Sequence, residues 1–398
     1  MPIPFWAAVV PSIIAFITTF ALVPQVRRFA IECRVADKPN GRKVHAHAIP
    51  HLGGVAIFGG FFFGLLVSLA SPGGSSLGDR LLALLPALLV VFGLGMVDDL
   101  RGLRAGTKLT YQILAASLTI AMGAGFRAVG TPGALEFFAL AAIGLFWYVG
   151  VCNSMNLIDG LDGLAAGTAT LAATGFLVVA LRVGEPAVVV ISLCLMGALL
   201  AFLRFNFHPA RIFMGDTGSM FIGFALAALA CILQRRIGFW PALLGSAAML
   251  GLPILDTTAA VIRRLAAGRH IFEADGEHIH HRLMRCGLSH RGAVLALYAL
   301  ESVFVVLGCG ILLGQLAWFV VAVAVAVGAG VTVAHLARRT PLEAVDAPVR
   351  APALRAVPAP AETQLAVHPA SRRPRTTEAV SEDVLAELPP AAAGGGPP

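Results

Sequence analysis

The sequence predicts an all-α polytopic membrane protein with about eleven transmembrane helices, and three observations support that prediction. Of the 398 residues, 58% are hydrophobic and 13% are charged, and the mean hydropathy is +0.83. A soluble globule cannot bury so much apolar surface, whereas a lipid bilayer accepts it as solvent. The second observation is a series of apolar runs of spanning length, and the third is the placement of the basic residues.

The apolar runs are long enough for helices that cross the hydrocarbon layer, which takes about 20 residues. They cover residues 5–26, 52–70, 80–97, 109–125, 134–152, 163–183, 187–205, 218–235, 239–262, 292–314 and 316–336. The first run is too long for a cleaved signal peptide, and its basic pair follows it instead of preceding it. We therefore expect a true span with the N-terminus outside and, after eleven crossings, a cytoplasmic C-terminus.

The basic residues agree with this orientation. Loops predicted to face the cytoplasm carry 17 Lys and Arg residues, whereas the opposite loops carry five, namely Arg80, Arg127, Arg182, Arg235 and Arg236. Such an excess is typical of cytoplasmic loops. The net charge of +7 therefore reflects membrane topology, and no basic stripe with interleaved aromatic residues predicts a nucleic-acid partner. The six cysteines form no C-x-x-C pair, so we expect free thiols.

Composition divides the chain at residue 337. Residues 1–337 form the predicted transmembrane domain, which carries every motif described below. Eleven of the 24 prolines fall in residues 338–398, where basic and acidic residues balance and long apolar runs are absent. Such a segment cannot bury enough apolar surface to offset its chain entropy, so we expect a disordered Pro-rich cytoplasmic tail.

The scarce carboxylates are clustered. Fifteen lie outside the tail, mainly in five segments: 37–51, 98–108, 153–162, 206–219 and 269–282. With eleven spans and an external N-terminus, all five segments emerge on the cytoplasmic side. The sequence therefore predicts one shared polar site at the cytoplasmic end of the bundle.

The pair Asp98-Asp99 ends the third predicted span. Adjacent carboxylates repel one another, and keeping both ionised near the membrane requires a cation. The pair fits metal or phosphate chemistry or a general base. A solvated helix end paired with Arg101 and Arg104 is the alternative.

A denser motif, Asn-Ser-Met-Asn156-Leu-Ile-Asp159-Gly-Leu-Asp162-Gly, joins two predicted spans. The glycines allow a close backbone approach to a ligand, and carboxylates three residues apart share a face on a helix. Oxygen ligands at this density suit Mg²⁺ bridged to substrate phosphates. A simple polar helix cap would not need four such groups in ten residues.

The segment from Asn206 to Ser219 has the same character. Asp216 lies where the eighth span begins, and a helix N-terminus favours anions. Phe213 could stack on a flat base, although an aromatic anchor at the membrane interface is an ordinary alternative.

Three histidines, His278, His280 and His281, lie with Arg282 in the long loop after the ninth span. They raise the alternative of zinc, but no third protein ligand is evident. A cluster that binds phosphate or sugar fits better, and Arg282 adds a fixed charge.

Further basic side chains lie in the predicted cytoplasmic loops. Arg42, Lys43 and His45 in the first loop fit membrane anchoring or a clamp on phosphate, and both roles are compatible. Asp256 lies inside the ninth span, where an ionisable group either has a functional role or pairs with a neighbouring arginine to hold the bundle; the sequence leaves both open.

Taken together, these five ordered motifs, over about residues 24–290, resemble the bacterial polyprenyl-phosphate N-acetylhexosamine-1-phosphate transferases of the WecA/TagO type, which are related to the translocase MraY. The resemblance implies transfer of GlcNAc-1-phosphate, or a related HexNAc-1-phosphate, from a UDP-sugar to undecaprenyl phosphate with release of UMP. It implies Mg²⁺, for which Mn²⁺ can substitute, a place in the cytoplasmic membrane and initiation of a cell-envelope polysaccharide. A homodimer is also compatible with the sequence.

By the same resemblance, Asp216 is the expected metal ligand. The expected catalytic residues are Asp98, Asp99, Asp159, Asp162, His278, His280 and His281, and the expected substrate-binding residues are Arg42, Lys43, His45, Lys108, Asn156, Asn206, Phe213 and Arg282. The His-x-His-His form favours a plain UDP-HexNAc donor over UDP-MurNAc-pentapeptide. Direct attack by the lipid phosphate and a two-step route through an aspartyl-phosphate both fit.

Two other classes of protein fit less well. A secondary transporter would place its ion sites near the bilayer midplane, whereas these acids crowd at one interface. A scaffold with merely solvated loops would scatter its acids over both faces.

Overall fold

The structure is a computed structural model that describes residues 4–33, 35–37, 49–71, 74–127, 133–271, 273, 277–315 and parts of 317–328. The chain divides into two compact units, Met1–Asp346 and Ala347–Pro398, and every described residue belongs to the first. The predicted tail, 338–398, lies outside the described residues, as do Arg42, Lys43 and His45.

Apart from loops and turns, the described part of the chain is helical except for two strands of two residues each, so the predicted all-α architecture is confirmed. The helices are α1 (Phe5–Glu32), α2 (Gly53–Leu69), α3 (Gly74–Arg101), α4 (Ala105–Thr119), η1 (Ile120–Ala124, a π-helical turn), α5 (Ala134–Ile158), α6 (Leu164–Val183), α7 (Pro186–Asn206), α8 (Gly215–Ile237), α9 (Phe239–Met249), α10 (Gly251–Ala266), α11 (Ile279–Arg285) and α12 (His290–Leu313). The strands β1 (Ala36–Asp37) and β2 (Ile49–Pro50) pair antiparallel.

Seven described helices, α1, α3, α5, α6, α7, α8 and α12, are long and apolar enough to cross a membrane, and α9 with α10 would make an eighth. Two more of the eleven predicted spans are the shorter helices α2, of 17 residues, and α4, of 15 residues followed by η1. The last, 316–336, lies mostly outside the described residues. The apolar runs thus correspond to helices, but of unequal length.

The outer helices expose large apolar side chains. On α5, Leu135, Phe138 and Phe146 are 85%, 68% and 80% exposed, and on α1 Trp6 and Ile17 are 51% and 56% exposed. In water such a surface would drive aggregation, whereas lipid tails solvate it. The chain is therefore a multi-pass membrane protein.

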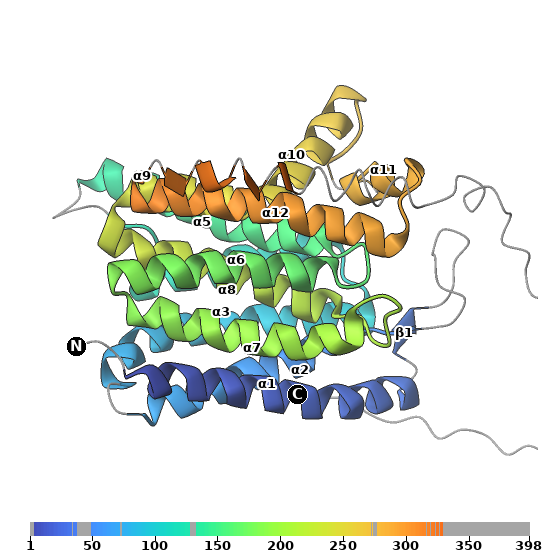
Figure 1. The fold of residues 1–398 in the computed structure, drawn as a ribbon, viewed down its shortest axis with the longest axis horizontal. Helices are drawn as coiled ribbons and strands as arrows, with labels where there is room; N and C mark the ends of the chain where they lie inside the picture. The colour runs from blue at the N-terminus through green and yellow to red at the C-terminus, as the bar shows by residue number, and fades with distance from the viewer. Residues whose placement is uncertain are drawn as a thin grey trace, which may run out of the picture. The chain divides into compact units, whose positions relative to one another are not determined.

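Helix α8 is the core of the bundle. Its most apolar 18-residue window is 94% buried, more than that of any other candidate span in the described residues. It packs against α2, α3, α5, α6, α7 and α9. Most of the bundle helices run side by side in Figure 1, with α9 at one end and β1 and α11 at the other. The first turn of α8 lies at the end marked by β1, because Phe213 just before it pairs with His51 just after β2.

Two glycines let neighbouring helices approach the start of α8. A Cβ on Gly95 of α3 would lie 2.5 Å from the Cα of Thr217, and one on Gly54 of α2 would lie 2.1 Å from the backbone nitrogen of Gly218. No side chain fits at these distances. The carboxyl end of α3 and the amino end of α8 are therefore in backbone contact.

The span predicted at 239–262 is broken. Helices α9 and α10 meet at Leu250 with a bend of 81°, so one straight helix over this segment is wrong. A break inside a bilayer frees backbone groups that need new partners. Glu301 of α12, fully buried, supplies one, since its Oε2 accepts a hydrogen bond from the Leu252 nitrogen at 3.1 Å.

The contact between α3 and α8 gives a prediction with a matched control. Gly95→Ala forces the two backbones apart, and overpacking of this kind costs roughly 1–3 kcal/mol. Gly93→Ala, on the same helix, adds a methyl group where nothing lies within 4 Å. We expect the unfolding midpoint in detergent to fall for Gly95→Ala and to hold or rise for Gly93→Ala. Equal midpoints would contradict the close approach.

Candidate active site

The polar segments meet at one end of the bundle around a cavity of about 720 Å³. This volume is in the range of small-molecule sites, roughly 300–1,000 Å³. Its walls come from α3, α5, the loops before α6 and α8, α11 and α12. Nine of the residues predicted from sequence line it: Asp98, Asp99, Asn156, Asp159, Asp162, Asn206, Phe213, Asp216 and His281.

Asp99 ties α3 to the first turn of α8. One carboxylate oxygen accepts a hydrogen bond from the Asp216 nitrogen at 2.8 Å, and the other accepts from the nitrogen and the hydroxyl of Thr217 at 3.0 and 2.5 Å. Asp99 thus satisfies donors that a helix N-terminus leaves free. Gly215, with φ of +69°, leaves room for it, because a Cβ there would lie 2.4 Å from the carboxylate.

Lys108 of α4 bridges two acids across the cavity wall. Its ammonium contacts the Asp98 carboxylate and donates to Asp216 Oδ2 at 2.6 Å. Asn156 of α5 donates to the other oxygen of Asp216 at 2.9 Å. The Leu103 nitrogen donates to Asp98 at 2.6 Å. Four separate elements therefore hold two carboxylates and one cation side by side, although Lys108 itself does not line the cavity.

Asp159 and Asp162 lie on a turn between α5 and α6, not on a helix, so the expectation that they share a helical face is wrong. Gly163, with φ of +83°, makes the turn possible. Burial, together with the nearby Asp216, Asp99 and Asp162, raises the pKa of Asp159 to about 8. Five acids line the cavity, and Lys108 pairs with two of them, Asp98 and Asp216.

Asn206 fixes that turn to the loop before α8. It is 2% exposed; its carbonyl accepts from the Gly163 nitrogen at 3.0 Å, and its amide donates to the Ile212 carbonyl at 3.0 Å. Phe213 is joined in turn to the strand β2, because its nitrogen donates to the Pro50 carbonyl at 2.9 Å. The cavity wall is therefore braced by backbone bonds from distant segments.

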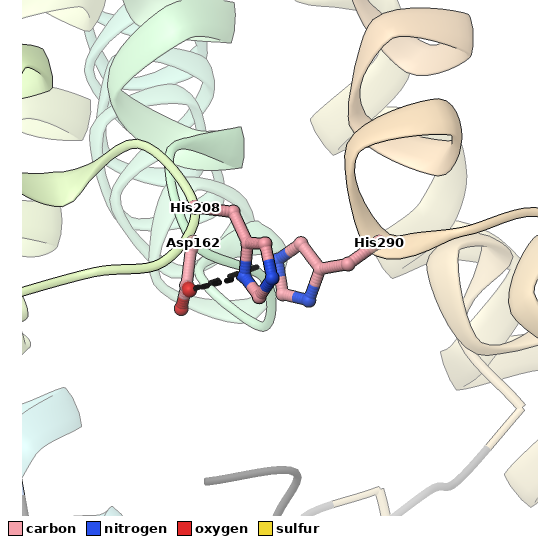
Figure 2. Close-up of side chains that lie close together, drawn as sticks. All are labelled: Asp162, His208 and His290. Carbon is pink, nitrogen blue, oxygen red and sulfur yellow. Dashed lines mark hydrogen bonds and ion pairs between the residues drawn. The ribbon is translucent and has the colours of Figure 1, made fainter.

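Two histidines that the sequence did not single out, His208 and His290, lie beside the turn with Asp162. Figure 2 shows His208 and His290 with their rings next to one another and Asp162 facing them. Asp162 Oδ2 lies 2.8 Å from His208 Nδ1 and 4.0 Å from His290 Nε2. The backbone nitrogen of Ala210 donates to the same oxygen at 3.0 Å.

This group brings three ligand atoms within 4.8 Å of one another, as a metal site would. The imidazole rings, however, stack with centroids 4.0 Å apart and planes 19° apart. Lone pairs of stacked rings point in nearly parallel planes, so an ion in the plane of one ring lies out of the plane of the other. The geometry favours a packed hydrogen-bonding wall over a metal centre.

The three histidines predicted as one cluster have different surroundings. His278 is buried and its Nδ1 lies 2.7 Å from Asp256 Oδ2, while the other oxygen of Asp256 accepts from the Ile279 nitrogen at 3.0 Å. Asp256 thus caps α11 and pairs with His278, not with an arginine. His280 packs on Gly160, and His281 lines the cavity.

The pKa shifts of α11 change one expectation. Burial, with neighbouring His281 and His278, lowers the pKa of His280 to about 4, and burial also lowers that of His281. His280 is therefore neutral at neutral pH and adds no positive charge to a cluster predicted to bind phosphate or sugar. Arg282 lies apart, on a second cavity of about 210 Å³ with Asp256 and Glu277.

Sequence reasoning missed His51, His208 and His290. His51 lines the cavity and its Nε2 lies 3.1 Å from the Asp99 carbonyl. The first two lie inside polar segments that the sequence marked, but a single histidine carries no pattern. His290 is the first residue of α12, beyond the last segment marked, and no sequence signal pointed to it.

Comparison with known proteins agrees with this site. Residues 81–234 match the family model described as glycosyl transferase family 4, a range that includes Asp98, Asp99, Lys108 and Asp216. A Bacillus subtilis protein named as a probable undecaprenyl-phosphate N-acetylglucosaminyl 1-phosphate transferase is 38% identical over 301 residues. That alignment covers 74% of this chain and 82% of the relative.

Two further relatives extend the comparison. The Mycolicibacterium smegmatis decaprenyl-phosphate N-acetylglucosaminephosphotransferase is 36% identical over 362 residues, covering 82% of this chain and 88% of its own length. The phospho-N-acetylmuramoyl-pentapeptide-transferase of Desulforudis audaxviator is 32% identical, covering 74% and 95%. The chain therefore belongs to glycosyl transferase family 4, within the group of prenyl-phosphate sugar-1-phosphate transferases.

Proposed function

We propose that this protein transfers N-acetylglucosamine-1-phosphate, or a related N-acetylhexosamine-1-phosphate, from its UDP-sugar to undecaprenyl phosphate. UMP is released, and the lipid product starts a cell-envelope polysaccharide. The proposal places the protein in the cytoplasmic membrane with the cavity facing the cytoplasm, where UDP-sugars are made. The excess of basic residues in the loops at the cavity end supports that orientation.

One observation carries the proposal: carboxylates from α3, the turn before α6 and α8 converge on a cavity at the end of an apolar bundle, and Lys108 pairs with two of them. A lipid phosphate anchored in the bilayer and a soluble nucleotide can both reach such a place. The relatives are named for polyprenyl-phosphate and N-acetylglucosamine-phosphate chemistry, which agrees with a site of this composition.

Mg²⁺ fits the donor set. Asp98, Asp159 and Asp216 offer hard carboxylate oxygens on one cavity, and burial together with the nearby Asp216, Asp99 and Asp162 raises the pKa of Asp159. We propose that Asp216 with Asp98 holds the ion. When bound, it would polarise the diphosphate and offset charge that develops on the leaving UMP.

The chemistry is a phosphoryl transfer. An oxygen of the lipid phosphate forms a bond to the β-phosphorus of the UDP-sugar, and the bond from that phosphorus to the bridging oxygen of UMP breaks. The attacking phosphate is already ionised at neutral pH, so a strong base is not required. Lys108 holds the carboxylates of Asp98 and Asp216 next to one another. His281 of α11 can donate a hydrogen bond to a phosphate or sugar oxygen.

The geometry favours direct attack over an aspartyl-phosphate. Both oxygens of Asp99 are occupied by donors of α8, and Asp98 is bound by the Leu103 nitrogen and by Lys108. A carboxylate that serves as nucleophile needs a free lone pair directed at the substrate. We assign Asp99 a positioning role, because it holds the helix turn that carries Asp216.

The first test is a UMP-release assay with purified protein, UDP-GlcNAc, undecaprenyl phosphate and Mg²⁺. We expect a chelator to abolish turnover, and Mg²⁺ or Mn²⁺ to restore it. Asp216→Asn should lower kcat by about 10³-fold or more while the protein stays folded, as expected for loss of a charged group at the reacting centre. Glu273→Gln, an exposed acid paired with Arg269, should keep wild-type turnover. Near-normal activity of Asp216→Asn would refute its metal role.

A donor panel tests the sugar. The His-x-His-His sequence predicts turnover with UDP-GlcNAc or another plain UDP-HexNAc and little with UDP-MurNAc-pentapeptide. UMP release under each donor is the measurement. No release with any UDP-HexNAc would end the transferase proposal, and preference for the pentapeptide donor would overturn the predicted specificity.

Asp256 provides a test of α11. Asp256→Asn weakens the bonds that hold His278 and the Ile279 nitrogen, and a bond to a charged group is worth about 1.5–3 kcal/mol. We expect kcat to fall roughly 10- to 100-fold, because His281 loses its fixed position. A wild-type kcat, with the Glu273→Gln variant as control, would show that α11 does not need this cap.

A further inference from the structure

A third cavity lies at the opposite end of the bundle from the active site. It is polar, has a volume of about 210 Å³ and is distinct from the cavity that Arg282 lines. Arg80 of α3, Arg235 of α8 and Arg127 after η1 line it, together with Asp79. Arg80 precedes Asp98 by 18 residues on the same helix, which is about 27 Å along the axis. The two cavities are therefore separated by roughly the thickness of the hydrocarbon layer.

The arginines gather here against the usual distribution of charge. The sequence places only five basic residues on this face, and cytoplasmic loops normally hold most of them. Four of the five converge: three line the cavity, and Arg236 shares the buried carboxylate of Glu185 with Arg80. Chance scatter would not bring sparse arginines from three segments together.

The protein itself fills only part of their hydrogen-bonding capacity. Glu185 lies 3.4 Å from Arg80 Nη2 and 3.0 Å from Arg236 Nε. Arg80 Nη1 is buried without a hydrogen-bond partner among the described residues. A guanidinium has five N–H donors, so a buried one left unsatisfied calls for an acceptor.

Gly123 brings two of the arginines together. Arg235 Nη2 donates to its carbonyl at 2.7 Å, and the guanidinium of Arg127 lies over its α-carbon, where a Cβ would be 1.8 Å from Nη2. Gln234 holds the Arg127 backbone on both sides, donating to its carbonyl at 2.5 Å and accepting from its nitrogen at 2.9 Å. The positively charged wall is thus built by backbone contacts.

We propose that this cavity binds a phosphate group on the membrane face opposite the active site. Planar guanidinium groups match the oxygens of phosphate in pairs, and several together suit an anion that carries more than one acceptor. The phosphate belongs either to the headgroup of an anionic lipid or to free inorganic phosphate. The site is separate from the transferase cavity, and its occupancy does not depend on turnover.

The test uses the purified full-length protein in neutral detergent. Thermal unfolding is followed with added phosphatidylglycerol, with phosphatidylcholine, and with inorganic phosphate against chloride at equal ionic strength. Lipid that remains bound after purification is quantified by mass spectrometry. The variants are Arg127→Gln, whose side chain is exposed; Asp79→Asn; and Arg182→Gln as the matched control on the same face outside the cavity.

We expect phosphatidylglycerol or inorganic phosphate to raise the unfolding midpoint by a few degrees in the wild type and in Arg182→Gln. Arg127→Gln should lose at least half of that shift and should retain several-fold less anionic lipid. Asp79→Asn should increase both the shift and the retained lipid.

An effect of the lipid alone identifies a headgroup site, and an effect of free phosphate identifies a soluble ligand. Equal shifts in wild type and Arg127→Gln, or no shift with either probe, would overturn the proposal. UMP release by Arg127→Gln in neutral detergent should stay at the wild-type rate, which separates this test from the transferase assay.

Discussion

The arrangement of the active site depends on one contact, between the carboxylate of Asp99 and the first turn of α8. Three donors of Asp216 and Thr217 bind Asp99, and the glycines of α2 and α3 let the backbones approach closely enough for this. Helix α8 is also the most deeply buried candidate span described. The position of α8 is therefore fixed by the helices packed around it. Asp216 lies in the first turn of α8, so its position is fixed as well.

Around this contact the charges are arranged unevenly. Acids crowd the cavity, Lys108 bridges two of them, and the pKa values of His280 and His281 are lowered. A cavity of this kind attracts a divalent cation far better than it attracts an anion alone. If Mg²⁺ binds here as proposed, phosphate substrates would enter together with the ion or after it.

Much of the fold and the site could be predicted because both depend on properties of continuous segments of the sequence. Length and apolarity identified the helices, and counting crossings placed the polar segments at one end, where Asp98, Asp159, Asn206, Asp216 and His281 now meet. Composition cannot report a break, since Leu250 sits in an apolar run that reads as one span. Glu301, which accepts a hydrogen bond from the Leu252 nitrogen beside the break, lies 49 residues away along the chain.

The site residues that sequence misread show the same limit. Asp159 and Asp162 have helical spacing, yet Gly163 turns the chain there and Asn206 holds the turn from another helix. His290 has no motif of its own and reaches the cavity only because α12 packs beside α6. Such roles come from tertiary contacts, which a single sequence does not display.

The contribution of α11 and α12 to the cavity has a consequence for biosynthesis. Tyr298 donates to the Gly163 carbonyl, and His281 and His290 complete the wall, so the turn between α5 and α6 has only its contacts to residues 206–212 until the ribosome has made residue 298. A nascent chain that has inserted α1 to α8 already contains the crowded acids but lacks His281 and His290. Assembly of the complete pocket is thus a late event in the synthesis of the chain.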